Sequence, residues 1–391
     1  MSDMTWSGNP GSKVTKNYAS VKSIVCPAAA WIGTDVCDYV YSEENTKNNL
    51  ICFWDMPDGR IAHCVARSHG SGSKHGVDFM TMGAEIAFSA DNGRNWTEPV
   101  PIALPDPLVT PGIENAIAGD LCLNTVLPDG NDGLLVFATL RYQNHACATM
   151  LMCRTKDFVT FTPWQRTFRQ DGYHVINGDR VIRTKSGRLV IPAARHVYKD
   201  HITYGGETVF FYSDDNGLTW CECDTVGTFP GRVGKRFGLQ EPGVCELNDG
   251  TLWAWARTDA GCQYQQFSED DGKTWSAPEP SLFRSPLSPM TVKRARDGRL
   301  IAVWNPIPGM WNHKTGPDWF LRTPIVISAS SDEGQTWTPY CVMDDAPEGN
   351  YCYSTIYPGE DYLLVSYYYT EPENPYNLAQ SKIKYIELGQ L

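Results

Sequence analysis

One short turn pattern, Ser-x-Asp-x-Gly-x-Thr/Asn-Trp, recurs along the chain and strongly limits its fold. It occupies residues 89–96, 213–220, 268–275 and 330–337, and a weaker version, TKDFVTF, lies at 155–161 in the widest gap. In such a turn the Ser and Asp side chains bond nearby backbone N–H groups, and the Gly takes a positive φ. A structural role for these turns is therefore expected. Recurrence at a regular interval is typical of a repeat protein.

A second kind of turn precedes the Ser-x-Asp turn in each repeat unit. It occurs six times, which indicates six units. Its positions are Asp58-Gly59, Asp132-Gly133, Ser186-Gly187, Asp249-Gly250, Asp297-Gly298 and 359–361. Asp-Gly between alternating apolar runs is typical of a β-hairpin. Six units of about sixty residues, each with four strands, predict an all-β chain folded as a six-bladed β-propeller with four-stranded antiparallel blades. We expect residues 1–391 to form this single domain, its ring closed by strands from both ends of the chain.

Charge and composition narrow the classes of partner. The net charge is −12 and the pI is about 5.1, which argues against nucleic acid and anionic membranes because both attract clustered Lys and Arg. No apolar run is long enough to cross a bilayer, and no secretory signal is visible. The thirteen cysteines lie mostly in apolar segments, so we expect free thiols and a cytoplasmic location. Cys221 and Cys223 lack further zinc ligands, and neither a metal nor a cofactor is expected.

The order of the hairpins predicts which residues share the face opposite the repeated turns. Because antiparallel strands reverse at each turn, the start of a first strand and the end of a second strand meet at one edge. Glu241 and Arg257 are therefore expected to be neighbours. Candidate positions on this face are Asn49, Arg67, Asp78, Arg141, His174, Asp179, Arg180, Arg195, Glu241, Arg257, Ser288, Asn305, Arg322 and Tyr353.

Four arginines on this face end second strands at similar offsets. Arg67, Arg141 and Arg195 each follow their turn glycine by eight residues, and Arg257 follows its own by seven. A guanidinium group offers a fork of donors that suits a carboxylate, so an anionic ligand near the axis of the ring is expected. The alternative is that each arginine pairs with an acidic residue at the rim.

The segments that carry these residues resemble those of the sialidase superfamily, and the resemblance extends over nearly the whole chain. QEPGVCELNDGTLWAWAR resembles the segment with a Glu and the second arginine of a carboxylate-binding triad, which implies those roles for Glu241 and Arg257. RTPIVISASSDEG implies that Arg322 is the third arginine, and NYCYSTIYPG implies that Tyr353 is the nucleophile. The family's general acid lies about a dozen residues before the first repeated turn, where Asp78 stands.

One position departs from the family pattern. Sialidases usually open the first blade with Arg-Ile-Pro, and Asn49 stands where that arginine would lie. Either Arg67, Arg141 or Arg180 takes its place, or the ligand is an acidic sugar other than an ordinary sialic acid. Asp179, in the segment HVINGDR, is an alternative general acid, and His174 is a further candidate for substrate binding.

The resemblance implies an exo-α-sialidase-like glycoside hydrolase that acts on an acidic glycan. It would release a terminal nonulosonic or related acidic sugar with retention, through a tyrosine nucleophile. A neutral tyrosine, with a reference pKa of about 10, is a weak nucleophile, so a carboxylate such as Glu241 is needed to take its proton. Two alternatives stay open: a carbohydrate-binding propeller without catalysis, and a propeller glycosidase or lyase that acts on another uronate-containing glycan.

Overall fold

The computed structural model describes an all-β chain, as the sequence predicts. The described residues are 30–42, 44–69, 83–116, 121–143, 147–169, 172–198, 202–230, 237–308, 322–346, 349–370 and 378–391. Within these ranges the only helical elements are the short 3-10 turns Pro107–Val109 and Leu388–Gln390. None of the described helical elements has the length and apolar character needed to cross a membrane. Every cysteine in this part of the chain is a free thiol.

The described strands form five hydrogen-bonded sheets, four of which have four antiparallel strands. The first contains β2 (Asn45–Asp55), β3 (Ile61–His69), β4 (Gly83–Ser89) and β5 (Val100–Pro101). Another contains β15 (Gln240–Glu246), β16 (Leu252–Arg257), β17 (Cys262–Ser268) and β18 (Glu279–Arg284). The next contains β19 (Thr291–Arg294), β20 (Leu300–Trp304), β21 (Ile325–Ser330) and β22 (Cys341–Asp344). The last joins β23 (Asn350–Pro358), β24 (Tyr362–Thr370) and β25 (Gln380–Glu387) to β1 (Thr34–Tyr39).

The remaining sheet, with nine strands, stands where two separate units were expected. One part contains β6 (Leu121–Pro128), β7 (Leu134–Tyr142), β8 (Cys147–Thr155) and β9 (Gln165–Arg166). The other contains β10 (Tyr173–Val175), β11 (Ile182–Arg183), β12 (Leu189–Tyr198), β13 (Ile202–Ser213) and β14 (Cys221–Glu222). The two parts join because β10 also pairs in parallel with β8, through Tyr173 and Ala148. This pairing explains why the described part has five sheets rather than six.

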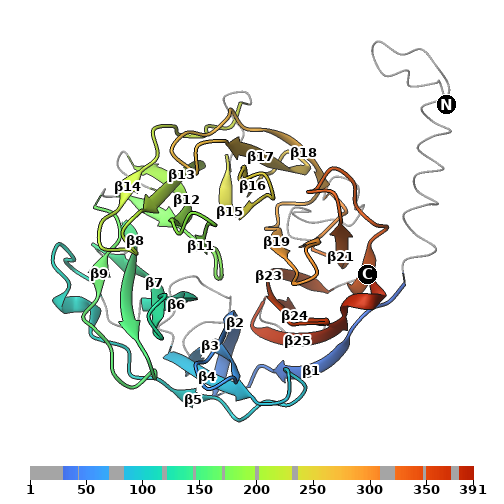
Figure 1. The fold of residues 1–391 in the computed structure, drawn as a ribbon, viewed down its shortest axis with the longest axis horizontal. Coiled ribbons are helices and arrows are strands. Elements are labelled where there is room, and N and C mark those ends of the chain that lie inside the picture. Colours follow the sequence, from blue (N-terminus) through green and yellow to red (C-terminus); the bar gives the residue numbers. More distant parts are fainter. Residues whose placement is uncertain are drawn as a thin grey trace.

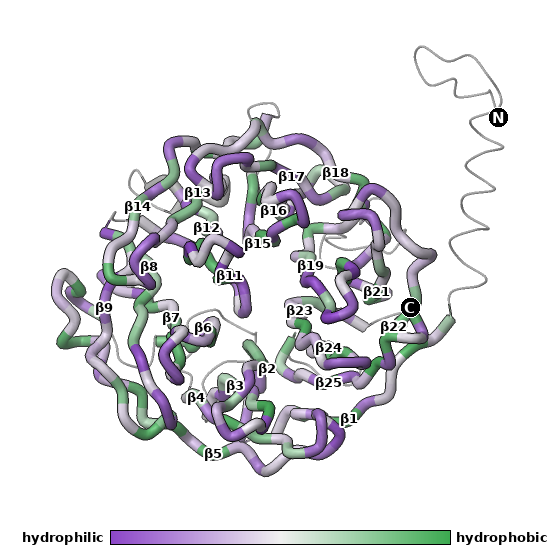
Figure 2. The backbone as a smooth tube through the Cα atoms, in the orientation of Figure 1, coloured by the Kyte–Doolittle hydropathy of each residue, from purple (hydrophilic) through white to green (hydrophobic). Residues whose placement is uncertain are grey.

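The sheets are arranged as a ring, with β2, β6, β11, β15, β19 and β23 toward its centre (Figure 1). Apolar clusters join each sheet to the next, and one of them joins Phe53 and Val65 of the first sheet to Leu364 and Ile383 of the last. Because both faces are covered by neighbouring sheets, strands such as β16 are buried at every position. Figure 2 shows that hydrophilic residues gather at turns such as the one beside β11.

The repeated turns have the internal bonds that the pattern predicts. In the turn 268–275, Ser268 Oγ donates to Asp270 over 2.9 Å and accepts the N–H of Gly272 over 2.8 Å. The N–H of Thr274 donates to the same carboxylate over 2.8 Å, and Trp275 Nε1 donates to the carbonyl of Gly272 over 3.1 Å. The turn is therefore closed by its own side chains.

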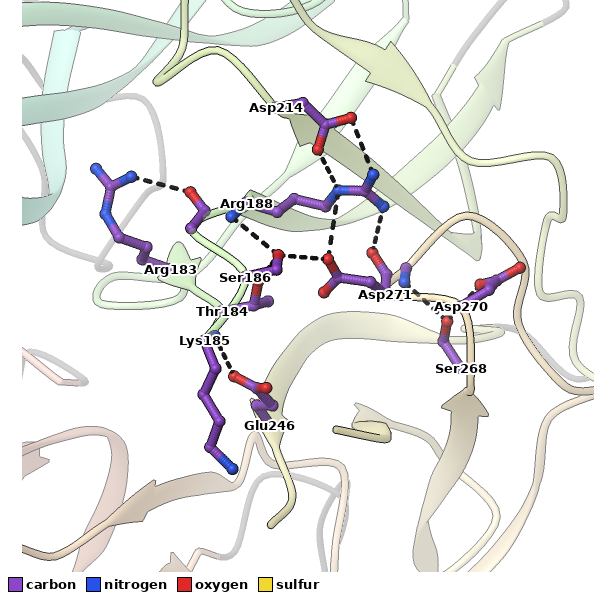
Figure 3. A network of polar contacts seen from close by, with 12 residues as sticks. Arg183, Thr184, Lys185, Ser186, Arg188, Asp214, Glu246, Ser268, Asp270 and Asp271 are labelled. Carbon is purple, nitrogen blue, oxygen red and sulfur yellow. Dashed lines mark hydrogen bonds and ion pairs between the residues drawn. The ribbon is translucent and has the colours of Figure 1, made fainter. Parts of the chain in front are cut away.

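In these turns, the residue before the glycine forms hydrogen bonds with the first hairpin of the preceding part of the ring. We term this contact the inter-sheet clamp. Asp271 accepts from Ser186 Oγ over 2.6 Å, and its carbonyl accepts from Arg188 over 2.7 Å (Figure 3). Asn216 donates to the carbonyl of Asp129 over 2.9 Å, a contact between the two parts of the nine-stranded sheet. Glu333 accepts from the backbone and side-chain nitrogens of Asn248, each over 2.8 Å. The clamp thus recurs at three junctions of the ring.

Candidate active site

Four of the predicted site residues meet at the inner part of the ring. Glu241 lies on β15, Arg257 ends β16, Tyr353 lies on β23, and Arg322 lies just before β21. Glu241 and Arg257 are neighbours because they flank the hairpin turn of one sheet, and Gln240 pairs directly with Arg257. Tyr353 and Arg322 come from two other sheets. The site therefore depends on the packing of sheets around the ring.

Arg257, Glu241 and Tyr353 form a closed triangle of polar contacts. Arg257 Nη1 lies 2.5 Å from one carboxylate oxygen of Glu241 and 3.4 Å from Tyr353 Oη. Tyr353 Oη donates to the other oxygen, Oε1, over 3.1 Å. One carboxylate thus binds a guanidinium group and a phenol at the same time.

The backbone is unusual at both Glu241 and Tyr353. Their φ angles are 47° and 54°, in the left-handed region that side chains other than Gly, Asn and Asp rarely adopt. Each lies in a β-bulge, where the register shifts between Gln240 and Gly243 and between Cys352 and Thr355. Bulges aim side chains away from the regular alternation of a strand and are common beside active sites.

Gly243 makes room for the bulge at Glu241. A Cβ atom at this position would lie 2.4 Å from the indole ring of Trp255. Trp255 is itself fixed, because its Nε1 donates to the carbonyl of Met290 over 2.8 Å. Any larger residue at position 243 would displace this part of β15.

Burial and charge keep Glu241 ionised and Tyr353 protonated. Burial alone would raise the pKa of Glu241, but the charges of Arg257 and Arg322 and the hydrogen bonds from Arg257 and Tyr353 outweigh it and lower the pKa. Burial, with the negative charge of Glu241, raises the pKa of Tyr353 above its ordinary value. The pair is thus a phenol donor with a carboxylate acceptor, as required for proton transfer from a tyrosine nucleophile.

Arg322 lies against the ring of Tyr353. The central carbon of its guanidinium group is 5.4 Å from the centre of the Tyr353 ring, and its Nη1 donates to Cys352 Sγ over 2.7 Å. Burial raises the pKa of Cys352 to about 11, so this group is a thiol at neutral pH. The Nε atoms of Arg257 and Arg322 are buried without a hydrogen-bond partner. Unsatisfied buried donors of this kind are costly and often mark a ligand site.

Asn305 and Ser288 hold the backbone at Arg322 by hydrogen bonds. Asn305 Nδ2 donates to the carbonyl oxygens of Arg322 and Pro324, each over 2.9 Å. Its own oxygen accepts from Ser288 Oγ over 2.5 Å. These two predicted positions therefore act on the backbone that carries the arginine.

Two of the arginines that follow their turn by eight residues form ion pairs with neighbouring carboxylates. Arg67 pairs with Glu85 over 2.9 Å, and Arg195 pairs with Glu222 over 2.8 Å. Arg141 lies on β7 opposite Ala148 of β8. Arg257 follows its glycine by seven residues, and one residue along a strand turns a side chain to the opposite face. This difference explains why Arg67 and Arg195 have other partners.

His174 and Asn49 are both buried. The His174 ring packs against Phe168 and Phe211, and its Nδ1 lies 3.2 Å from the carbonyl of Ala148. Burial lowers the pKa of His174 to about 4. Asn49 Oδ1 is buried on β2 without a hydrogen-bond partner. Asp78 lies outside the described residues.

Asp179 and Arg180 lie between β10 and β11 and make contacts across the ring. Asp179 forms an ion pair with Lys293 of β19 over 2.6 Å and accepts a hydrogen bond from Thr355 of β23. Arg180 is buried, and its Nη2 donates to the carbonyl of Met290 over 2.7 Å and to Thr291 Oγ1 over 3.2 Å. Both side chains thus bind other parts of the protein.

Three residues at the site, Thr291, Ser354 and Cys352, were not expected there from the sequence. Thr291 and Ser354 share two hydrogen bonds, and Cys352 binds Arg322. Only their places in the sequence could have indicated that these residues lie near the site. Cys352 and Ser354 flank Tyr353, and Thr291 begins the first strand of its hairpin. Short polar side chains in strands gave no chemical reason to select them. The described residues contain no group of three or more His, Cys, Asp or Glu side chains that could hold a metal ion.

Comparison with known proteins places the chain among sialidases and their relatives. The model of the BNR repeat-like domain family matches residues 84–365. An anhydrosialidase from Macrobdella decora is 24% identical over 177 residues, which cover 44% of this chain and 22% of that protein. The chain thus aligns with less than a quarter of that relative.

Solved structures extend the similarity of the fold over most of the chain. The Hadza microbial sialidase Hz136 has a TM-score of 0.65 at 16% identity, covering 89% of this chain and 67% of that one. An intramolecular trans-sialidase from Ruminococcus gnavus, in complex with oseltamivir carboxylate, has a TM-score of 0.62 at 14% identity, covering 93% of this chain and 99% of that one. At these identities the likeness concerns the fold alone.

Proposed function

The chain belongs to the BNR repeat-like domain family, within the sialidase superfamily, and from this premise we propose that it is an exo-α-sialidase-like retaining glycoside hydrolase. Its substrate would be an acidic glycan or glycoside that ends in a nonulosonic or related sugar. The observation that carries this proposal is the contact of Tyr353 Oη with Glu241 Oε1 over 3.1 Å, beside the guanidinium group of Arg257.

In the proposed first step, Tyr353 Oη attacks the anomeric carbon while the bond to the leaving oxygen breaks. The phenol proton passes to Glu241, and the leaving oxygen takes a proton from a general acid. A tyrosine suits an anionic substrate because a carboxylate nucleophile would repel it. In the second step water attacks the anomeric carbon from the vacated side and gives its proton to the general acid, which now acts as a base, while the tyrosine leaves and takes its proton back from Glu241. Two inversions give net retention.

Arg257 and Arg322 are the proposed ligands of the substrate carboxylate. They come from two sheets and contact different parts of Tyr353: Arg257 lies 3.4 Å from its oxygen, and Arg322 lies 5.4 Å from its ring centre. A carboxylate bound by both would hold the anomeric carbon close to the nucleophile. Asp78 is proposed as the general acid from its spacing to the first repeated turn, and Asn49 as a departure that changes which acidic sugar fits.

We also propose that the ring is a closed six-bladed propeller, with the nine-stranded sheet counted as two blades. Three observations support this arrangement. The parts of that sheet meet through a single parallel residue pair, Tyr173 and Ala148. An apolar cluster joins the first and last sheets. The side chain of Leu364, in the last sheet, lies so close to Gly93 that a Cβ atom there would be 2.4 Å away.

The proposed activity is tested by incubating the protein with a panel of acidic glycosides. The panel contains α-linked sialic acids, other α-keto-acid sugars and uronates, and the released sugar is identified by mass and its initial anomeric configuration by NMR. We expect release of a keto-acid sugar with its α configuration retained. An inverted product would rule out the tyrosyl intermediate. Binding without release would indicate a carbohydrate-binding module, and an unsaturated product that absorbs in the near ultraviolet would indicate a lyase.

A further inference from the structure

The residue that follows the proposed nucleophile is tied to a neighbouring sheet by two hydrogen bonds. Thr291 Oγ1, at the start of β19, donates to the carbonyl oxygen of Ser354 over 2.6 Å. Ser354 Oγ in turn donates to Thr291 Oγ1 over 2.9 Å. Both residues are buried. Ser354 lies inside the bulge that gives Tyr353 its left-handed backbone.

Arg180 completes the hydrogen bonding of this threonine. Its Nη2 donates to Thr291 Oγ1 over 3.2 Å and to the neighbouring carbonyl of Met290 over 2.7 Å. A hydroxyl group has one proton to donate and two lone pairs to accept with. Thr291 uses its proton on Ser354 and both lone pairs on Ser354 and Arg180, so its rotamer is fixed from three directions.

Asp179 holds the next residue of the same segment. Its carboxylate accepts a hydrogen bond from Thr355 Oγ1 and pairs with Lys293 Nζ over 2.6 Å. The backbone of Asp179 and Arg180 is fixed in turn, because their N–H groups donate to Asn124 O over 2.8 Å and Thr125 Oγ1 over 3.2 Å. Asp179 therefore holds Thr355 directly, and Arg180 holds Ser354 through Thr291 of a third sheet.

We propose that Asp179, Arg180 and Thr291 are positioning residues that hold the bulge after Tyr353 and so aim its hydroxyl group at Glu241. The catalytic part of this inference rests on the proposed function. A tyrosine at a φ of 54° is strained, and it keeps this backbone only where the surroundings impose it. The brace supplies that constraint from across the ring. It also assigns Asp179 and Arg180 a role other than general acid and substrate ligand.

The test replaces Thr291 by Val, which keeps its shape but removes all three hydrogen bonds. We expect kcat for an acidic aryl glycoside to fall about 10- to 100-fold while KM changes little, because Arg257 and Arg322 are untouched. T291S keeps the hydroxyl group and is expected to restore most of kcat. The matched control is T149V, because Thr149 is equally buried but its Oγ1 has no partner. Wild-type kcat in T291V, or an equal loss in T149V, would overturn the brace.

A second variant separates positioning by Asp179 from general acid catalysis. D179N keeps an oxygen that can accept from Thr355 but has no acidic proton. A positioning role predicts the same fold-loss for an aryl glycoside and for a glycan with a poor leaving group. A general acid is needed far more by the poor leaving group. A loss confined to the glycan would therefore overturn the positioning role of Asp179.

Hydrogen exchange tests the brace without any turnover. We expect amides in a peptide covering 350–358 to exchange at least about 10-fold faster in T291V than in wild type, and unchanged in T149V. If the wild type cleaved no acidic glycoside, the proposed function would fail, and this measurement would still decide the brace. Equal exchange in T291V and wild type would overturn it, whatever the activity.

Discussion

Tyr353 Oη donates to Glu241 Oε1 over 3.1 Å, although 112 residues separate them in the chain. Each residue has a positive φ and each lies in a bulge of the strand of its sheet that is nearest the centre of the ring. The contact between two residues with strained backbones differs from an ordinary polar contact at the rim of a sheet. The strain at each residue costs about 1–3 kcal/mol and must be offset by the surrounding structure. We interpret the pair as the chemical centre of the site.

Replacing Tyr353 by Phe should abolish turnover while leaving the fold intact. The variant keeps the ring that packs against Tyr368, at 5.3 Å between centroids, and loses only the oxygen that we propose as the nucleophile. We expect kcat to fall by at least about 1,000-fold with binding of a keto-acid sugar retained, measured by kinetics and calorimetry. Y368F is the control, since it removes the neighbouring phenol oxygen instead. Turnover of Y353F at wild-type rates would exclude this residue as the nucleophile.

The pH dependence should reflect the lowered pKa of Glu241. Burial would raise this pKa, but the opposing charges of Arg257 and Arg322 lower it below the ordinary value of 4.5. The carboxylate therefore stays ready to accept a proton at mildly acidic pH. We expect the acid limb of kcat/KM for an aryl glycoside, which needs little help from a general acid, to lie below pH 4.5. An acid limb near pH 6 would mean that another group with a higher pKa controls the reaction.

Arg322 should contribute to binding through the carboxylate of the substrate. R322K keeps the positive charge but loses the planar fork that suits a carboxylate. We expect KM for an acidic glycoside to rise about 10-fold or more, with a smaller change in kcat. The control is the same glycoside with its carboxylate converted to an amide. If R322K weakened both substrates equally, Arg322 would act through the structure of the site instead.

The order of the strands predicted all four residues of the candidate site on one face, but only one of their contacts follows from local strand pairing. Glu241 and Arg257 flank Gly250 in one hairpin, so their proximity follows from local pairing, which the structure confirms. The pairing of Arg67 with Glu85 could not be foreseen. The number of residues between a turn and a strand residue tells how far along the strand that residue lies. The face of the sheet on which its side chain lies, however, alternates from one residue to the next.

The brace behind Tyr353 shows a further limit of reading sequence alone. Thr291 and Ser354 are 63 residues apart and belong to different sheets. Hydrogen bonds between short polar side chains depend on side-chain orientation as well as on the order of the strands. No turn signal or hydrophobic period marks such a pair. The sequence could therefore predict the ring, but it could not predict which buried hydroxyl groups stabilise the bulge.

The inter-sheet clamp should contribute to stability without affecting catalysis. Glu333 pairs with Arg294 over 2.7 Å and binds Asn248 of the preceding sheet, on the face of the ring opposite the candidate site. We expect E333Q to lower the free energy of unfolding by about 0.5–1 kcal/mol, measured by denaturant titration at neutral pH, with kcat unchanged. Gln has the same side-chain length as Glu, and the positive φ of position 333 is equally unfavourable for both residues. E269A, at an exposed carboxylate of another repeated turn, is the control and should have a smaller effect.

The same variant carries a pH signature that identifies the ion pair as the cause. The hydrogen bonds from Arg294 lower the pKa of Glu333 in the folded protein. A group whose folded pKa is depressed stabilises the fold fully above its unfolded pKa, which is 4.5 for Glu. That contribution is lost as the pH falls through the folded value. The stability gap between wild type and E333Q should therefore be constant from pH 8 to about 5 and close below it. A gap that persisted unchanged at low pH would show that the charge of Glu333 does not stabilise the clamp.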